Sequence, residues 1–388
     1  MKMMTAKIKP DIRQITRMVP ATGNLVQGQS ELAIDPGLAQ AASEMIAASQ
    51  NHYSPAEGVA ELRRAVTQKL SAINRIEIDA DAKPLELLIT PGATGGLISI
   101  AQTFLRKSSA LVFEPYYPYH RRIIEELGGA TEILSLRGED LELDEDELRA
   151  RCRELKTRRE YPLRAIIVCT PVNPTGKVFT REELESIARV CEEFDLLCIS
   201  DEVYEHYVVG DRPHISIAIL PGMWERTITV NSFSKSWNIS GWRLGYAFGS
   251  GELVSPLNNA NNVFYVCSPT PLQKALAEVL MADESYYTGL RERFITKRNV
   301  AVSVLSELGF QIYDSGSAFY VWARIPEGYG DAMKFNEMLM TRAQVAAVPG
   351  SAFTDNNAWD NHMRLCIARE DEILYGALDK IRNALKDK

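Results

Sequence analysis

The chain has 388 residues, of which 46% are hydrophobic and 24% are charged. This composition excludes a disordered chain. The length allows two or three domains, or one large domain with a smaller one. Lys and Arg number 43 against 51 Asp and Glu, so the net charge is −8, which argues against broad binding to nucleic acid or to an anionic membrane.

The cysteines and the N-terminus do not point to a secreted or membrane protein. The six cysteines show neither a CxxC spacing nor a zinc-type spacing with the five histidines, so we expect buried free thiols and no metal site. The N-terminus lacks the apolar stretch of a secretory signal, and no apolar run approaches the ~20 residues of a membrane span. We therefore expect a cytoplasmic protein.

Short apolar runs alternate with helical patterns through the first two thirds of the chain. The runs predict strands at 85–90, 109–114, 164–170, 195–200 and 226–232. Helices are predicted after the first three strands, at 93–105, 120–129 and 180–194. Thr180 and Glu183 form a capping box at the start of the third helix. The alternation is typical of α/β proteins with a mostly parallel sheet covered on both faces.

The pattern changes beyond about residue 270. It is helical to about residue 310, then gives short strand-like segments and a terminal helix at 371–385. We expect a large domain at 40–284 and a smaller α+β domain at 285–388. The N-terminal arm, residues 1–39, is expected to pack against the smaller domain.

Two turn-rich segments follow predicted strands, at the sheet edge where open α/β sheets bind ligands. The segment TPGATGG, 90–96, is a candidate phosphate cradle, because backbone amides at a helix N-terminus attract anions; a turn without a ligand is the commoner explanation of such a motif. In PVNPTGKV, 171–178, Pro174 restricts Asn173 to an extended conformation. That loop is suited to aiming one amide side chain.

Two further segments carry charged residues after strands. Asp201 would lie at the end of a central strand, where a carboxylate is costly to bury unless it is paired. A protonated ring nitrogen is one such partner, and a helix N-cap is the alternative explanation. Lys235 and Arg243 stand among apolar and hydroxyl side chains in SFSKSWNISGWRLGYAFG. A lysine in such surroundings can become a nucleophile toward carbonyls, and an arginine can bind a phosphate with two hydrogen bonds.

Six segments now stand in a characteristic order along the chain. They are GATGG, PYYPY, PVNPTGKV, SDEVYEHY, SFSKSWNISGWRLGYA and RLCIA. Over residues 20–385 this set resembles the class I/II aminotransferases, enzymes of fold type I that use pyridoxal 5′-phosphate. The resemblance implies a large three-layer α/β/α domain plus a smaller α+β domain. It also implies transfer of an amino group from an L-amino acid to a 2-oxo acid, with the group carried on the cofactor as pyridoxamine phosphate.

The resemblance also implies roles for single residues around the cofactor ring. Lys235 resembles the lysine that binds the cofactor's aldehyde and moves the substrate's α-proton. Asp201 resembles the partner of the pyridine nitrogen, and Tyr204 and Asn173 resemble the two donors to the ring's phenolate oxygen. Tyr117 resembles the aromatic residue that stacks on the ring, with its neighbour Tyr116 as the alternative.

Other residues resemble those that hold the cofactor's phosphate and complete a dimer. The phosphate would be held by Ala93, Thr94, Ser232, Ser234 and Arg243. Tyr53, in NHYSPAEG, resembles a tyrosine that reaches the phosphate from the neighbouring subunit. The resemblance therefore implies a homodimer with shared active sites.

Substrate binding is implied for three residues. Arg364 resembles the arginine that binds the α-carboxylate as a fork, Asn173 lies beside that site, and Gly28 resembles a glycine whose backbone closes over the carboxylate. The chain departs from the family pattern where the substrate is expected to enter the site. Gln29 follows Gly28 where proline is usual, and Gly95 replaces a larger residue. These departures leave the substrate open.

Two other functions and several residues stay open. A lyase, a substituent-replacing enzyme or a ring-forming synthase would use the same cofactor site. A non-catalytic binding or regulatory protein would be expected to lack Lys235 or Asp201, and both are present. His206 fits either a place beneath the ring or simple packing. The residues Phe319, Tyr320 and Trp322 suggest strand core, although one of them would fit a side of the pocket.

Overall fold

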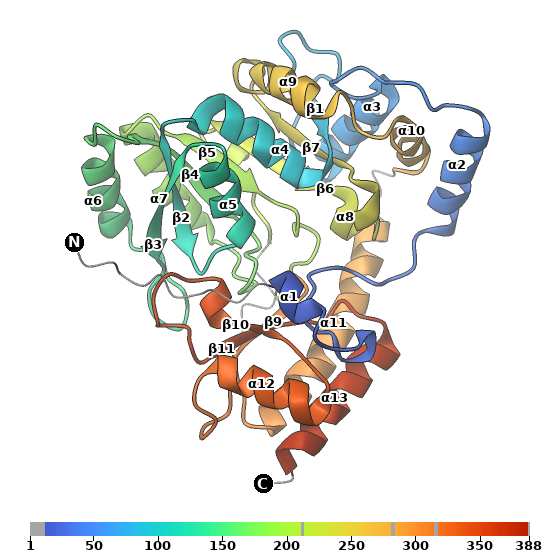
Figure 1. Cartoon of the computed structure of the whole chain (residues 1–388). Helices are drawn as coiled ribbons and strands as arrows, with labels where there is room; N and C mark the ends of the chain where they lie inside the picture. Colours follow the sequence, from blue (N-terminus) through green and yellow to red (C-terminus); the bar gives the residue numbers. More distant parts are fainter. Residues whose placement is uncertain (1–11, 211–212, 281–283, 314–316, 387–388) are drawn as a thin grey trace.

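The computed structural model describes residues 12–210, 213–280, 284–313 and 317–386. Residues 1–11 of the expected N-terminal arm therefore lie outside the described part. Two sheets organise the chain, one of seven strands and one of four strands (Figure 1). The seven-stranded sheet lies in the upper part of that view, and the four-stranded sheet lies below it.

The seven-stranded sheet carries most of the elements expected from the sequence. Its strands, in spatial order, are β1 (Leu87–Thr90), β7 (Gly245–Gly249), β6 (Thr227–Ser232), β5 (Leu197–Asp201), β4 (Leu163–Cys169), β2 (Ser109–Glu114) and β3 (Ala130–Ser135). Only β7 runs against its neighbours, β1 and β6, and the other pairs are parallel. The expected α/β fold with a mostly parallel sheet is confirmed.

Helices cover both faces of this sheet. One face packs against α4 (Gly92–Ile100), α5 (Pro118–Glu126) and α9 (Gly251–Tyr265). The other face packs against α6 (Glu145–Lys156), α7 (Arg181–Glu193), α2 (Pro36–Ala47), α3 (Ala60–Lys69) and α10 (Thr270–Val279). Alternate strand residues supply the two layers of core: in β2, Ala110 and Val112 face α4 and α5, and Leu111 and Phe113 face α6 and α7.

The four-stranded sheet forms a second core. Its strands are antiparallel, in the order β10 (Val348–Pro349), β11 (His362–Cys366), β9 (Tyr320–Arg324) and β8 (Gln311–Ile312). It packs with α11 (Glu284–Glu307), α12 (Ala332–Ala343) and α13 (Asp371–Lys386). The N-terminal segment joins this part, because Leu25 donates its backbone N–H to Ala346 and accepts one from Cys366.

The structure also corrects the strand prediction. The five predicted strands are present to within two residues, and Thr180 and Glu183 form the capping box that begins α7. The strands β3 and β7 were not predicted. β3 is an edge strand that is mostly only partly buried, so its sequence lacks a continuous apolar run. The two glycines that bound β7 masked its strand pattern.

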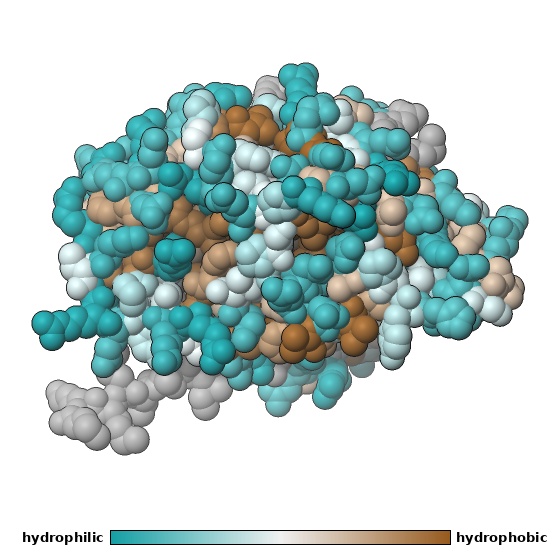
Figure 2. Space-filling view, turned by 90° about the horizontal axis from the view of Figure 1, so that it is seen from above, coloured by the Kyte–Doolittle hydropathy of each residue, from teal (hydrophilic) through white to brown (hydrophobic). Residues whose placement is uncertain are grey.

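Hydrophobic residues are mostly inside the molecule. Figure 2 shows hydrophilic residues over most of the face seen from above, with hydrophobic residues between them. In the described part of the chain, no helix combines the length and the apolar character that crossing a membrane requires.

Candidate active site

A cavity of about 520 Å³ lies at the carboxyl ends of the parallel strands. Residues of both sheets line it, together with α1 (Ile12–Thr16), the short blue helix near the centre of Figure 1. It brings together every cofactor- or substrate-binding residue expected from the sequence except Tyr53. Those residues are Gly28, Ala93, Thr94, Tyr117, Asn173, Asp201, Tyr204, Ser232, Ser234, Lys235, Arg243 and Arg364.

Lys235 enters the cavity from α8 (Phe233–Ser236), the single turn that follows β6. Its Nζ donates to the carbonyl oxygen of Gly28 at 2.7 Å. Burial lowers the pKa of the lysine to about 8, and Arg364 and Arg243 act in the same direction. About a tenth of the side chain is therefore a neutral amine at pH 7, far more than for an ordinary lysine, and the neutral amine is the nucleophilic form.

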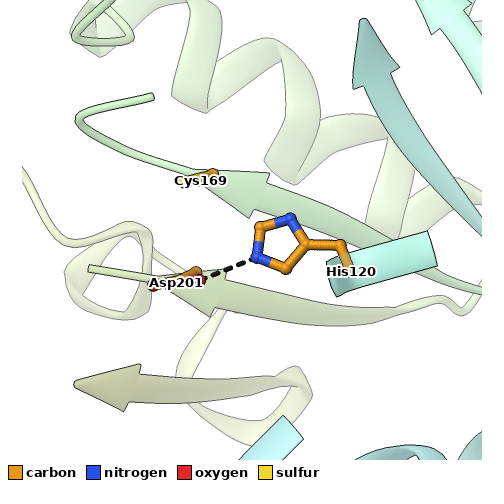
Figure 3. Close-up of side chains that lie close together, drawn as sticks. All are labelled: His120, Cys169 and Asp201. Carbon is orange, nitrogen blue, oxygen red and sulfur yellow. Dashed lines mark hydrogen bonds and ion pairs between the residues drawn. The ribbon is translucent and has the colours of Figure 1, made fainter. Parts of the chain in front are cut away.

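Asp201 ends β5 and is held by a histidine. The ring of His120, on α5, points at the end of β5, and its Nε2 lies 2.7 Å from Oδ2 of Asp201 (Figure 3). Both side chains are buried. The sequence analysis missed His120. Its signal was the spacing to Ile123 and Ile124, which places it on the buried face of α5.

Cys169 ends the neighbouring strand β4, beside this pair (Figure 3). Burial raises the pKa of the Cys169 thiol, and Asp201 acts in the same direction. The thiol therefore stays neutral, and a neutral thiol is a poor metal ligand. The cluster does not argue for a metal ion here.

Three tyrosine side chains, Tyr117, Tyr204 and Tyr320, line the same cavity as Asp201. The hydroxyl groups of Tyr204 and Tyr320 lie 2.7 Å apart, and burial raises the pKa of Tyr204 so that it stays a hydrogen-bond donor. Tyr320 lines the cavity and is therefore the one residue of its strand segment at the side of the pocket. Tyr117 lines the cavity, whereas Tyr116 is turned away and donates to Asp355.

A polar cradle forms where β1 and β6 end. Ser232 Oγ donates to Ser234 Oγ at 2.7 Å, and the first turn of α4 offers backbone N–H groups that have no partner within the helix. Gly92, at φ +71°, closes the cradle: a Cβ there would lie 2.6 Å from Nη2 of Arg243. The combination of hydroxyls, amides and a guanidinium suits a phosphate.

Arg364, on β11, faces the same cavity from the smaller sheet. It is buried, and its Nη1 donates to Oδ1 of Asn173 at 2.7 Å and its Nη2 to the carbonyl oxygen of Val26 at 2.6 Å. Its Nε is buried and has no hydrogen-bond partner among the described residues. A guanidinium held in this way is suited to a carboxylate that enters the cavity.

Two expected residues lie elsewhere. Tyr53 is 84% exposed and outside the cavity. His206 does not line the cavity; its ring stacks on Tyr287 with 3.7 Å between centroids, and its Nε2 lies 3.3 Å from Oε1 of Glu205. The packing interpretation of His206 is the one the structure supports.

Comparison with known protein families decides what this arrangement belongs to. Residues 21–381 match the family described as aminotransferase class I and II. The chain belongs to this family. An aspartate aminotransferase of Pyrococcus abyssi is 32% identical over 365 residues, which cover 93% of this chain and 91% of that protein. An aromatic-amino-acid aminotransferase of Thermococcus litoralis is 33% identical over the same shares of the two chains.

Solved structures agree with the family assignment. The N-succinyldiaminopimelate aminotransferase of Mycobacterium tuberculosis superposes with a TM-score of 0.89 at 31% identity, covering 96% of each chain. The protein is thus an aminotransferase, an enzyme that moves an amino group between an amino acid and a 2-oxo acid, in a family that uses pyridoxal 5′-phosphate. The lyase, synthase and regulatory alternatives gain no support from these relatives.

Proposed function

We propose that the cavity holds pyridoxal 5′-phosphate and that its residues carry out the amino transfer. The observation that carries the proposal is the presence, in one cavity, of a lysine with a lowered pKa, a carboxylate, an anion cradle and a buried arginine. The donor set fits the cofactor. A phosphate suits the cradle beside Gly92, and the unpaired Nε of Arg364 leaves a donor for a carboxylate.

Each residue then has a defined task. When bound, the cofactor supplies a reactive aldehyde carbon and a ring that withdraws electrons. Lys235 binds the aldehyde, and its neutral amine takes the α-proton and returns it, as general base and then as general acid. Asp201, oriented by His120, keeps a proton on the pyridine nitrogen.

The remaining side chains orient the reacting groups. Tyr204 and Asn173 donate to the phenolate oxygen of the ring, and Tyr117 packs on its face. Arg364 binds the α-carboxylate of the substrate, and the backbone of Gly28 closes over it. Because Gly28 O accepts from Nζ of Lys235, the segment that covers the substrate also positions the lysine.

The same proposal covers the domains and the cellular compartment. We propose a cofactor-binding domain at 40–284 and a smaller domain at 285–388 with the arm 1–39. The backbone hydrogen bonds of Leu25 to Ala346 and Cys366 support the place of the arm. All six cysteines are free, which supports a reducing compartment such as the cytoplasm.

A homodimer with shared active sites is also part of the proposal. Tyr53 is the expected partner-reaching residue, and its high exposure leaves it available to a second subunit. Exposed apolar side chains lie at the end of α9, namely Val263, Phe264 and Val266. Asn261 of the same helix donates to the carbonyl oxygen of Ala56, which brings α9 close to the Tyr53 segment. An apolar surface of this kind is typical of a subunit interface.

An amino-donor panel tests the proposal. The purified protein, supplied with pyridoxal 5′-phosphate, is mixed with single amino acids, including aspartate and aromatic amino acids, which the relatives' names suggest. We expect at least one donor to change the absorbance of the bound cofactor and to yield its 2-oxo acid. No change with any donor would refute the proposal.

A matched pair of lysine variants identifies the covalent site. Lys235→Ala is expected to remove the absorbance of the covalently held cofactor and to lower the turnover by about 10²–10⁴-fold or more. Lys334→Ala, which changes an exposed lysine on α12, is expected to leave both unchanged. A covalent adduct that survives in Lys235→Ala would assign another lysine.

A further inference from the structure

An irregular segment, residues 202–207, connects two residues of the proposed site. Asp201 ends β5 directly before it, and Tyr204 lies within it. The segment belongs to none of the helices and strands of the described chain. Because a loop positions a side chain less precisely than a helix or a strand does, further contacts must fix the direction of Tyr204.

Glu205, the neighbour of Tyr204, is the centre of a buried hydrogen-bond cluster. Its Oε1 accepts from Nζ of Lys69 at 2.5 Å and from Nδ2 of Asn231 at 2.6 Å. Its Oε2 accepts from Nδ2 of Asn74. Lys69 and Glu205 are only 2% and 7% exposed, and neither is among the residues that line the cavity. This ion pair therefore lies behind the site and not in it.

The donors to Glu205 come from elements that are well apart in the sequence. Lys69 ends α3, and Asn231 lies on β6. Asn231 also accepts, through its Oδ1, from the backbone N–H of Ser232 at 2.7 Å, and Ser232 belongs to the expected phosphate cradle. The side chain of Glu205 thus joins the loop to a helix and to the strand that leads into the cradle.

The ring of Tyr204 has its other contacts on the side of the smaller sheet. It packs edge-on against Phe319 and Tyr320, with 5.0 and 5.7 Å between ring centroids. Most residues expected around the cofactor ring, in contrast, belong to the larger sheet and its loops. The Glu205 cluster ties the backbone beside Tyr204 to the larger sheet through Asn231.

The charge of this pair needs an explanation other than stability. Burial raises the pKa of Glu205, but the positive charge of Lys69 outweighs burial, and the pKa is held well below its usual range. The carboxylate is therefore ionised. A buried ion pair often contributes no more to stability than apolar side chains of similar size, because both charges lose their hydration. In some proteins such groups specify one conformation.

We propose that Glu205, paired with Lys69, is a positioning residue for amino transfer, and that it aims the hydroxyl group of Tyr204 at the phenolate oxygen of the cofactor ring. The inference rests on the proposed function, which gives Tyr204 that task. A donor to the ionised oxygen lowers the pKa of the bound cofactor, because it favours the charged form. A hydroxyl group that points elsewhere would raise this pKa.

The test follows the absorbance of the bound cofactor as a function of pH, without substrate. Y204F removes the hydroxyl group, and E205Q removes the charge of Glu205 while it keeps the size of the side chain. We expect both variants to raise the pH of the absorbance change by about half a unit or more. In Y204F/E205Q the value should equal that of Y204F, because two residues that act through one contact are not additive.

Two further variants separate positioning from stability. Asp371→Asn makes the same carboxylate-to-amide change in the ion pair of Lys297 between α11 and α13, outside the cavity lining, and should leave the pH of the absorbance change as it was. K69M/E205Q replaces both charges. It should unfold within about 5 °C of the unmodified enzyme and still show the raised value, so it serves if E205Q alone fails to fold.

The outcomes separate this inference from the function on which it rests. If Y204F raises the value and E205Q does not, the inference is overturned and the proposed function stands. A shift in E205Q that persists in full on the Y204F background also overturns it, because Glu205 would then act on the cofactor without Tyr204. If Y204F itself changes nothing, the task that the proposed function gives to Tyr204 is refuted, and the inference falls with it.

Discussion

At the scale of single residues, the environment of Lys235 sets the pH range in which its side chain is a neutral amine. Burial lowers the pKa of this lysine from 10.5 to about 8, because a protonated amine loses hydration in the cavity. Below that pKa the nucleophilic amine is the minor form, and its fraction falls about tenfold for each pH step downward. A lysine with the usual pKa would stay mostly protonated up to about pH 10.

We therefore predict the pH dependence of reconstitution. The rate at which the cofactor-free enzyme binds pyridoxal 5′-phosphate should rise about tenfold between about pH 6 and 7 and level off above about pH 8. Stopped-flow absorbance measures this rate. The same measurement with N-α-acetyl-lysine gives the profile of an ordinary amine and corrects for ionisation of the cofactor. A rise that continues to about pH 10 would contradict the lowered pKa.

His120 shows why some residues of a site escape sequence analysis. A lone buried histidine on an apolar helix face fits ordinary core packing, and its spacing to Ile123 and Ile124 indicates only burial. Its partner Asp201 is 81 positions away in the sequence, and only the packing of α5 against β5 brings the two within 2.7 Å. A hydrogen bond of this kind to a charged group contributes about 1.5–3 kcal/mol.

At the scale of elements, the turn between β1 and α4 depends on one glycine. Gly92 has φ +71°, a backbone conformation that residues other than glycine rarely adopt. It faces the guanidinium of Arg243. A methyl group at this position would lie 2.6 Å from Nη2 of Arg243 and would push it out of the cradle. The position of the Arg243 side chain therefore depends on a glycine in this turn.

A glycine pair separates the effect on the cradle from the effect on the backbone. Gly92→Ala should weaken binding of pyridoxal 5′-phosphate about tenfold or more, because it displaces the proposed phosphate ligand. Gly128→Ala imposes a similar backbone strain at φ +83°, but its methyl group would meet no atom within 4 Å. It should cost about 1–2 kcal/mol of stability and leave cofactor affinity unchanged. Equal affinity losses in both variants would refute the cradle at Gly92.

Elements differed in how well the sequence predicted them. The strand at 109–114 was predicted at its observed bounds, and the capping box gave the observed start of α7. Both predictions succeeded because an apolar run and a capping box are contained in the segment itself. The edge strand β3 and the glycine-bounded strand β7 were missed, because each is a strand only through its pairing with a neighbour. The sequence of one segment does not show with which strand it pairs.

At the scale of the whole molecule, the exposed apolar residues near the end of α9 bear on assembly. Val263 is 81% exposed, and Phe264 and Val266 are 45% and 46% exposed. Tyr53, which we propose to reach the partner's phosphate site, is 84% exposed. A single surface that buries all four would both remove apolar area from water and complete the active site.

This arrangement predicts the effect of one surface charge. Val263→Asp should raise the dissociation constant of the dimer by about 100-fold, because the interface would bury an unpaired carboxylate. Analytical ultracentrifugation measures this constant. Met333→Asp places the same charge at an exposed apolar residue of α12 and should leave the assembly unchanged. A dimer that persists in Val263→Asp would exclude the α9 surface as the interface.

The sequence by itself determined the fold class, the aminotransferase family and most of the cavity's lining, because those features depend on local patterns at strand ends. Lys235, Asp201, Asn173 and Arg364 each lie in a segment with its own signature. Only the tertiary structure brought His120 to Asp201, turned Tyr320 into the cavity and paired Lys69 with Glu205. Such contacts join residues far apart in the chain, and the packing of whole elements decides them.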